Sequence, residues 1–205
     1  MLVKILITLT VLLVLSQLGS IFHVLPLVAG SLFRPLSAMS LENNVRVARE
    51  RNVTALILLV PAILIIGRWK VWNPAFLEGF SQNAALGIMA AVAVGWIILR
   101  RLIALWLRPR RRPDVYRCAV NGALSFFILG MLLALAGIGL MVLFKANDNV
   151  ARYFLIITAG AFYLLYLLHK VQILSLSCGA LRTFLYLCTL EFLPLAILLV
   201  PAMVL

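Results

Sequence analysis

The sequence predicts an all-α protein, a polytopic bundle of about six transmembrane helices with short amphipathic helices at the membrane interface. Two observations lead to this prediction. First, 65% of the 205 residues are hydrophobic and only 12% are charged, whereas soluble domains are about 45 to 50% apolar and about 25% charged. Second, the apolar residues are gathered in long uncharged runs, and a helix that crosses the bilayer needs roughly 17 to 25 such residues. We therefore treat residues 1–205 as a single integral membrane domain.

Six apolar runs are long enough to cross the bilayer. The predicted spans are residues 5–27, 53–71, 84–107, 118–144, 153–168 and 183–205. Two amphipathic stretches, residues 36–52 and 171–181, are expected to lie along the interface. The first run is longer than the roughly 7 to 15 apolar residues of a cleavable signal peptide, so we interpret it as a retained span. Pro194 and Pro201 are expected to kink the last span and to free backbone carbonyls there.

The charge of the chain is strongly basic, with 18 Lys plus Arg against 6 Asp plus Glu and a formal net charge of +12. Most of the basic residues follow the first, third and fifth predicted spans, so the positive-inside rule places both termini outside the cytoplasm. The densest cluster consists of Arg108, Arg110, Arg111 and Arg112. It fits a topology signal or a patch that attracts anionic lipid headgroups. Because the basic residues lie between apolar runs, the charge does not indicate nucleic-acid binding.

Small residues recur on one face of two predicted spans. They are Gly87, Ala91 and Gly95 in the third span, and Gly130, Ala134 and Gly137 in the fourth. Faces of this kind allow helix backbones to approach closely. We interpret them as packing surfaces, either within the bundle or between copies of the chain, and they require no ligand.

Glu191 is an ionisable residue inside a predicted span, about 12 Å from its start by helix rise. Such a group costs several kcal/mol unless it is protonated, paired or hydrated. Gln17 lies at a comparable depth in the first predicted span, and His23 and Asn121 are further candidates for a polar cluster with Glu191. The alternative is a neutral Glu191 that is hydrogen-bonded to a backbone carbonyl freed by the following proline.

Sequence patterns of known catalytic sites are absent. The chain has no HExxH, GxSxG or paired acidic metal motif, and no Gly-rich phosphate loop followed by Lys. Cys118, Cys178 and Cys188 lie in apolar stretches without a CxxC pair, which indicates neither a zinc site nor a disulfide framework. We therefore expect no metal and no other cofactor, and the balance of these patterns argues against an enzyme.

The C-terminal stretch from Arg182 reads RTFLYLCTLEFLPLAILL, and its most specific part is LYLCTLEFLP, from Leu185 to Pro194. This stretch resembles the closing signature of a family of bacterial multi-span inner-membrane proteins that is defined only by a domain of unknown function. The resemblance implies the inner membrane of a Gram-negative bacterium, with both termini then on the periplasmic side, and it implies no particular chemistry. It also places Glu191 inside the signature.

Three functions are compatible with these observations. The leading hypothesis is a noncatalytic membrane partner or scaffold subunit, which contacts anionic headgroups and assembles with a protein partner or with itself through the small-residue faces. The alternative is a small transporter or proton-coupled carrier in which Glu191 binds a proton or cation between broken helices. The third is a lipid-modifying membrane enzyme, which requires a nucleophile near Glu191, and the candidate is Cys188.

Overall fold

The computed structural model of this chain describes residues 2–33, 40–72, 74, 77, 79–106, 113–145, 147–175, 180–192 and 194–196. Within these ranges the chain forms helices and turns, without a strand. Four helices are long and apolar enough to cross a membrane: α4 Val45–Arg68, α5 Gln82–Trp106, α6 Pro113–Leu143 and α7 Asp148–Ser175. The all-α prediction is therefore confirmed, with four helices that could cross a membrane, whereas a count of six spans and the short interfacial helices are not confirmed.

The first predicted span, residues 5–27, is not one straight helix in the structure. It comprises two helices, α1 Leu2–Ser16 and α2 Leu18–Phe33, whose axes are bent by 70° at the break. The backbone N–H of Gln17 donates to Val14 O at 3.2 Å, and Ser16 Oγ donates to Leu13 O at 2.8 Å. Such local hydrogen bonds compete with the regular helix and bend it. The pair makes a fifth candidate span only if its two halves are counted as one.

The expected interfacial helix over residues 36–52 is divided between a short helical turn and the second span. Residues 40–43 form the turn, Asn44 follows, and α4 then begins at Val45. The side-chain oxygen of Asn44 accepts a hydrogen bond from Val47 N at 3.4 Å, which is a typical N-cap. Residues 45–52 are therefore the first turns of α4 and do not form a separate interfacial helix. Residues 34–39 lie outside the described residues.

The C-terminal third also differs from the prediction. α7 continues to Ser175, past the expected end at residue 168, because Ile173 and Leu174 are buried against Cys118 of α6. Residues 171–175 therefore belong to a span and not to an interfacial helix. The chain then forms the short helix α8, Ala180–Leu187, and the π-helical turn η2, Cys188–Phe192. A sixth span over residues 183–205 is not confirmed, and residues 176–179 and 197–205 lie outside the described part.

The π turn has a local cause in the sequence. Pro194 has no backbone N–H, and its ring crowds the carbonyl four residues earlier, so a regular α-helix is disfavoured just before it. The hydroxyl of Thr189 also donates to Leu185 O at 2.8 Å, which takes up a carbonyl of the preceding turn. A π turn that contains Glu191 therefore precedes Pro194, and Pro201 lies outside the described residues.

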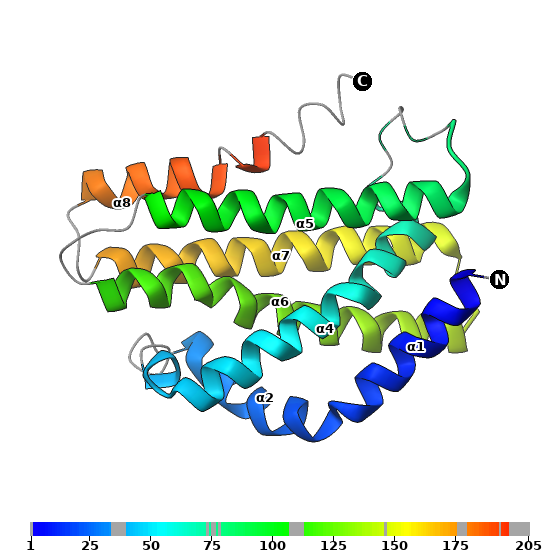
Figure 1. The fold of residues 1–205 in the computed structure, drawn as a ribbon, viewed down its shortest axis with the longest axis horizontal. Coiled ribbons are helices and arrows are strands. Elements are labelled where there is room, and N and C mark those ends of the chain that lie inside the picture. The colour runs from blue at the N-terminus through cyan, green and yellow to red at the C-terminus, as the bar shows by residue number, and fades with distance from the viewer. Residues whose placement is uncertain are drawn as a thin grey trace.

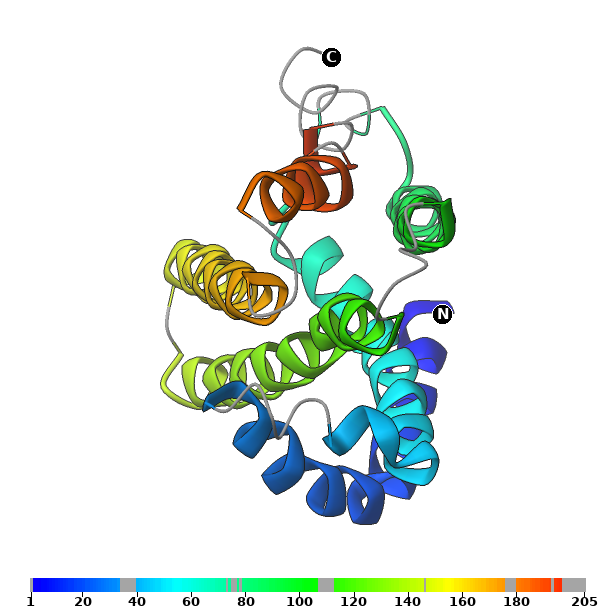
Figure 2. The same cartoon turned by 90° about the vertical axis from the view of Figure 1, so that its left-hand side faces the viewer.

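The long helices surround a central space. α5, α6 and α7 run alongside one another, α4 crosses them, and α1 and α2 lie on the outer side of α4 and α6 (Figure 1). In the view along the bundle, α5 and α7 lie on opposite sides, with α8 across the top and α6 and α4 below (Figure 2). The core between α4 and α6 is a cluster of small and branched apolar residues that includes Leu58 and Ile128.

The two small-residue faces have different surroundings. On α6, a Cβ added at Gly130 would lie 3.1 Å from the ring of Phe162, and one at Gly137 would clash with the ring of Phe154, so this face packs against α7. On α5, a Cβ at Gly87 or Gly95 would have no neighbour within 4 Å among the described residues. In the most apolar 18-residue stretch of each long helix, only 11% is buried in α5, against 28 to 33% in α4, α6 and α7. α5 is therefore the least enclosed of the long helices.

Candidate functional site

A cleft of about 420 Å³, open on part of its length and called the chamber below, lies between α4, α5, α6 and α7. Most of its wall is apolar, and it includes Ile65 of α4, Trp96 of α5, Phe127 of α6 and Phe162 of α7. Its volume is within the range of about 300 to 1,000 Å³ that is usual for sites that bind small molecules. The chamber exists because α5 packs mainly against α4 and η2 rather than against α7.

The chamber is elongated and has one polar end. Its lining runs on α7 from Leu155 to Tyr166 and on α6 from Ala123 to Ala134. Either stretch corresponds to about 16 Å of helix. The polar groups that line one end are Arg100, Tyr163, Tyr166 and Glu191. Elsewhere the lining is apolar apart from Thr158.

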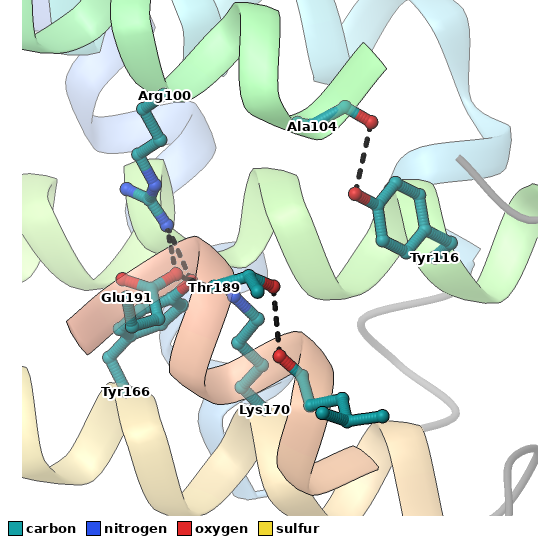
Figure 3. A network of polar contacts seen from close by, with 8 residues as sticks. Arg100, Ala104, Tyr116, Tyr166, Lys170, Thr189 and Glu191 are labelled. Carbon is teal, nitrogen blue, oxygen red and sulfur yellow. Dashed lines mark hydrogen bonds and ion pairs between the residues drawn. The ribbon is translucent and has the colours of Figure 1, made fainter. Parts of the chain in front are cut away.

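Glu191 is held at this polar end by three donors that converge on one carboxylate oxygen, Oε1 (Figure 3). Nη2 of Arg100 lies 2.7 Å from it, the hydroxyl of Tyr166 2.6 Å and Nζ of Lys170 2.5 Å. Nη2 of Arg100 also donates to the Tyr166 hydroxyl at 2.5 Å. Lys170 and Glu191 are 1% and 2% exposed. We call these four residues the Glu191 cluster; it joins α5, α7 and η2.

The local structure explains how these side chains meet. Tyr166 and Lys170 are four residues apart, so they lie on the same face of α7. The π turn before Pro194 turns Glu191 towards that face (Figure 3). Cζ of Arg100 lies 5.4 Å and Nζ of Lys170 lies 5.5 Å from the centre of the Tyr166 ring. Both cations therefore also interact with the aromatic ring.

The Glu191 cluster contains one carboxylate and two cations, so it has an excess of one positive charge. Two buried polar atoms at the same end of the chamber, Nε of Arg100 and the hydroxyl of Tyr163, have no hydrogen-bond partner among the described residues. A buried donor without a partner costs about 1 to 3 kcal/mol. The polar end of the chamber therefore has both charge and hydrogen-bonding capacity to offer to a ligand.

A second buried carboxylate forms a different arrangement, which we call the Glu42 cluster. Nη1 of Arg51 lies 3.0 Å from Glu42 Oε2, and Nδ2 of Asn121 donates to Glu42 Oε1 at 2.5 Å. The side chains of Arg51 and Glu42 are only 3% and 10% exposed. One carboxylate faces one cation, so the charges balance. The cluster joins the turn at residues 40–43 to α4 and α6.

The cavity beside the Glu42 cluster is very small. It has a volume of about 10 Å³ and is lined by residues that include Arg51, Ser125, Phe126 and His169. That is roughly the smallest space that accommodates one water molecule. Phe126 also lines the large chamber, and its ring lies 5.6 Å from that of His169 and 5.8 Å from that of Tyr166. This ring therefore lies between the two cavities.

The structure does not bring the polar residues predicted from the sequence together. Gln17 lies in the break between α1 and α2. His23 of α2 contacts Glu50 of α4, with Nδ1 and Oε2 at 3.0 Å. Asn121 contacts the Glu42 cluster and not Glu191. Glu191 is paired with two cations, and this pairing replaces the expected hydrogen bond to a carbonyl freed by the proline.

Sequence reasoning missed the three partners of Glu191. Arg100 lies six residues before the end of α5 and Lys170 five residues before the end of α7, so both are charged residues inside long apolar helices. A signal was nevertheless present, because a lone acid in an apolar helix is expected to pair with a base on a neighbouring helix. Arg108, Arg110, Arg111 and Arg112 lie outside the described residues. Cys188 is partly buried in η2 and does not line the described wall of the chamber.

Comparisons with protein-family models, with curated proteins and with solved structures found no match. The resemblance of Leu185 to Pro194 to an uncharacterised bacterial inner-membrane family therefore stays a prediction.

Proposed function

We propose that this protein is a noncatalytic membrane protein that binds the apolar chain of an amphiphile inside its helix bundle. The observation that carries this proposal is the 420 Å³ chamber, which is apolar along its length and polar at one end. An amphiphile is likewise apolar along its chain and polar at its head. It would place its chain between α5, α6 and α7 and its head beside the Glu191 cluster. Sites for small molecules commonly combine an apolar wall with a few convergent polar groups in this way.

Two observations favour a binding protein over the carrier and enzyme hypotheses. Glu191 is compensated by two cations, which favours a fixed carboxylate over one that exchanges a proton during transport. The described wall of the chamber contains no Cys or His that would act as a nucleophile or a base. The basic loops and the C-terminal resemblance support a place in the inner membrane of a bacterium, with both termini in the periplasm, which we include in the proposal.

The proposal can be tested through Trp96, which lines the chamber. Replacing Trp69, Trp72 and Trp106 by Phe leaves Trp96 as the only one of the four tryptophans. Single-chain amphiphiles that carry bromine on the chain are then titrated into the protein in detergent micelles. Bromine quenches tryptophan fluorescence at short range, so a chain inside the chamber is expected to give saturable quenching of Trp96.

Two alanines of α7 provide a matched pair of variants for this titration. Both are exposed, and Ala159 lines the chamber, whereas Ala161 lies outside the chamber lining. Ala159→Phe is expected to fill part of the chamber and to abolish saturable quenching, and Ala161→Phe is expected to leave it unchanged. Quenching that is linear in the amphiphile concentration and equal in both variants would show only micelle contact, and the proposal would be wrong.

A scaffold function is the second candidate, and it is favoured by the exposed small-residue face of α5. Faces of this kind are frequent where membrane helices associate. Gly87→Leu together with Gly95→Leu is expected to abolish energy transfer between labelled copies in liposomes. Gly139→Leu on α6 is the control, because a Cβ at Gly139 also has no described neighbour within 4 Å. Energy transfer that is absent in the unmodified protein, or equal in all variants, would contradict assembly through α5.

A further inference from the structure

We propose that the amphiphile is a long-chain carboxylate whose head binds Arg100 and Tyr163. This inference rests on the proposed function, because the head is placed by a chain that occupies the chamber. It goes further by naming the charge and the chemical class of the ligand. Three features support it: the charge balance of the Glu191 cluster, the two donors without described partners at the polar end, and the size of the chamber.

The charge balance favours a monovalent anion. Arg100 and Lys170 exceed the single carboxylate of Glu191 by one positive charge, and Lys170 is almost fully buried. An unbalanced charge in an apolar surrounding is costly, and one negative charge bound beside it would lower that cost. A carboxylate carries that charge, whereas a phosphate monoester carries about −1.5 to −2 near neutral pH. A zwitterionic head adds no net charge.

The two donors without described partners indicate where the head binds. Nε of Arg100 and the hydroxyl of Tyr163 are buried, and both residues line the chamber. Hydrogen bonds from a guanidinium to a carboxylate are among the stronger ones in proteins, and each of the two oxygens can accept. Lys170 does not line the chamber. It therefore contributes its charge to the site, while Arg100 and Tyr163 make the contacts.

The charged side chains that line the described wall are Arg100 and Glu191. Glu191 would repel an incoming anion if it were uncompensated, but Oε1 already accepts from three donors, two of which are cations. The net field at the polar end is therefore that of the excess cation.

The size of the chamber indicates a single chain. The volume of 420 Å³ lies at the lower end of the range that is usual for small-molecule sites, about 300 to 1,000 Å³. It therefore favours a ligand with one chain over a ligand with two. Arg100 lies six residues before the end of α5 at Trp106, about 9 Å along the helix. The head site is therefore near one end of the span, where the head of a lipid chain would lie.

The test uses the protein with Trp96 as its only tryptophan and compares four brominated probes of equal chain length at neutral pH. The probes are the fatty acid, the alcohol, lysophosphatidic acid and lysophosphatidylcholine. We expect the fatty acid to bind about tenfold more tightly than the alcohol and than either phosphate probe. Inorganic phosphate, added alone at millimolar concentration, is expected not to displace the fatty acid, because it has no chain.

Variants assign the preference to the proposed residues. Arg100→Gln is expected to weaken the fatty acid about tenfold and to leave the alcohol unchanged, and Arg100→Lys is expected to restore part of the loss. Tyr163→Phe is expected to weaken the fatty acid about threefold. Arg101→Gln and Tyr153→Phe change exposed residues of the same two types, outside the chamber lining, and are expected to have no effect. Because Tyr163 has no described hydrogen-bond partner, its variant tests the site even if Arg100→Gln folds poorly.

The outcomes separate the two proposals. Equal affinity for the fatty acid and the alcohol, with quenching still abolished by Ala159→Phe, would overturn the carboxylate and leave the proposed function in place. Tighter binding of lysophosphatidic acid would overturn the monovalent head. Displacement of the fatty acid by inorganic phosphate would overturn the role of the chain. Saturable quenching by none of the probes would overturn the proposed function itself.

Discussion

The Glu42 cluster and the Glu191 cluster are built from the same kinds of side chain but differ in charge and in what lies beside them. In both, a buried carboxylate joins three segments of the chain through an arginine and an uncharged donor. The Glu42 cluster is neutral, and the cavity beside it has a volume of about 10 Å³. The Glu191 cluster has one additional cation, Lys170, and borders the 420 Å³ chamber.

The difference distinguishes a closed contact from a site that is open to a ligand. A balanced ion pair has no excess charge to neutralise, and it fixes how its segments pack, although Glu42 Oε2 has no hydrogen-bond partner among the described residues. A cluster with an excess charge, and with donors that lack partners, is stabilised by an additional anion. The Glu42 cluster therefore attaches the turn at residues 40–43 to α4 and α6. The Glu191 cluster attaches η2 and also gives one end of the chamber an excess positive charge.

The largest effect on the free energy of unfolding is expected for Glu191→Gln. This change leaves two buried cations without a counter-charge, so a loss of about 5 kcal/mol is expected. Glu42→Gln leaves only Arg51 and is expected to lose about 3 kcal/mol. Unfolding is measured in bicelles by titration with denaturing detergent. Glu50→Gln, in an exposed ion pair, is the control and should have little effect. Equal losses for Glu191→Gln and Glu50→Gln would contradict the excess charge.

A smaller effect is expected when one arginine is removed from each cluster. Arg51→Gln leaves the buried Glu42 without a cation, and a loss of about 3 kcal/mol is expected. Arg100→Gln leaves Glu191 paired with Lys170, so only about 1 kcal/mol is expected from the lost hydrogen bonds. Arg101→Gln is the matched control for the exposed end of α5. If Arg100→Gln proved as costly as Arg51→Gln, Lys170 would not compensate Glu191 and the two clusters would be equivalent.

The sequence predicted the long helices because run length and hydropathy act locally. The four long helices α4 to α7 coincide with apolar runs that were identified by the thickness of the bilayer alone. The bend at Gln17 was missed because an apolar run carries no information about direction. The same rule ended the fifth predicted span too early, at residue 168, because a charged residue, Lys170, follows, and a tertiary partner buries that charge.

The candidate site was predictable only in part, for the same physical reason. Glu191 was identified because a carboxylate in an apolar run is costly wherever it lies. Its partner Arg100 is 91 residues away in sequence, and pairing across that distance depends on which helices are neighbours. Gln17, His23 and Asn121 were matched to Glu191 by depth, and depth does not determine adjacency. The chamber depends on α5 lying apart from α7, which no local pattern indicates.

A modest effect is expected when the uncharged donor is removed from each cluster. Asn121→Leu removes one of the two side chains that contact Glu42, and a loss of about 1.5 kcal/mol is expected. Tyr166→Phe removes one of three donors to Glu191, and about 1 kcal/mol is expected because two cations still donate. The same unfolding titration ranks the two variants. The reverse order would show that the tyrosine, rather than the cations, holds Glu191 in place.

The smallest effect on unfolding, and the most specific one, is expected for Lys170→Met. The change leaves an unbranched, uncharged side chain that is one atom shorter, and Glu191 stays paired with Arg100, so the cluster becomes neutral like the Glu42 cluster. A lost hydrogen bond is offset by the removal of a desolvated cation, and the free energy of unfolding is expected to change by less than about 1 kcal/mol. The preference of the chamber for a fatty acid over the alcohol should nevertheless fall about tenfold, because the excess charge is gone. A preference that survived Lys170→Met would show that the head is held by the contacts to Arg100 and Tyr163 alone, and the difference in charge between the two clusters would then have no role in binding.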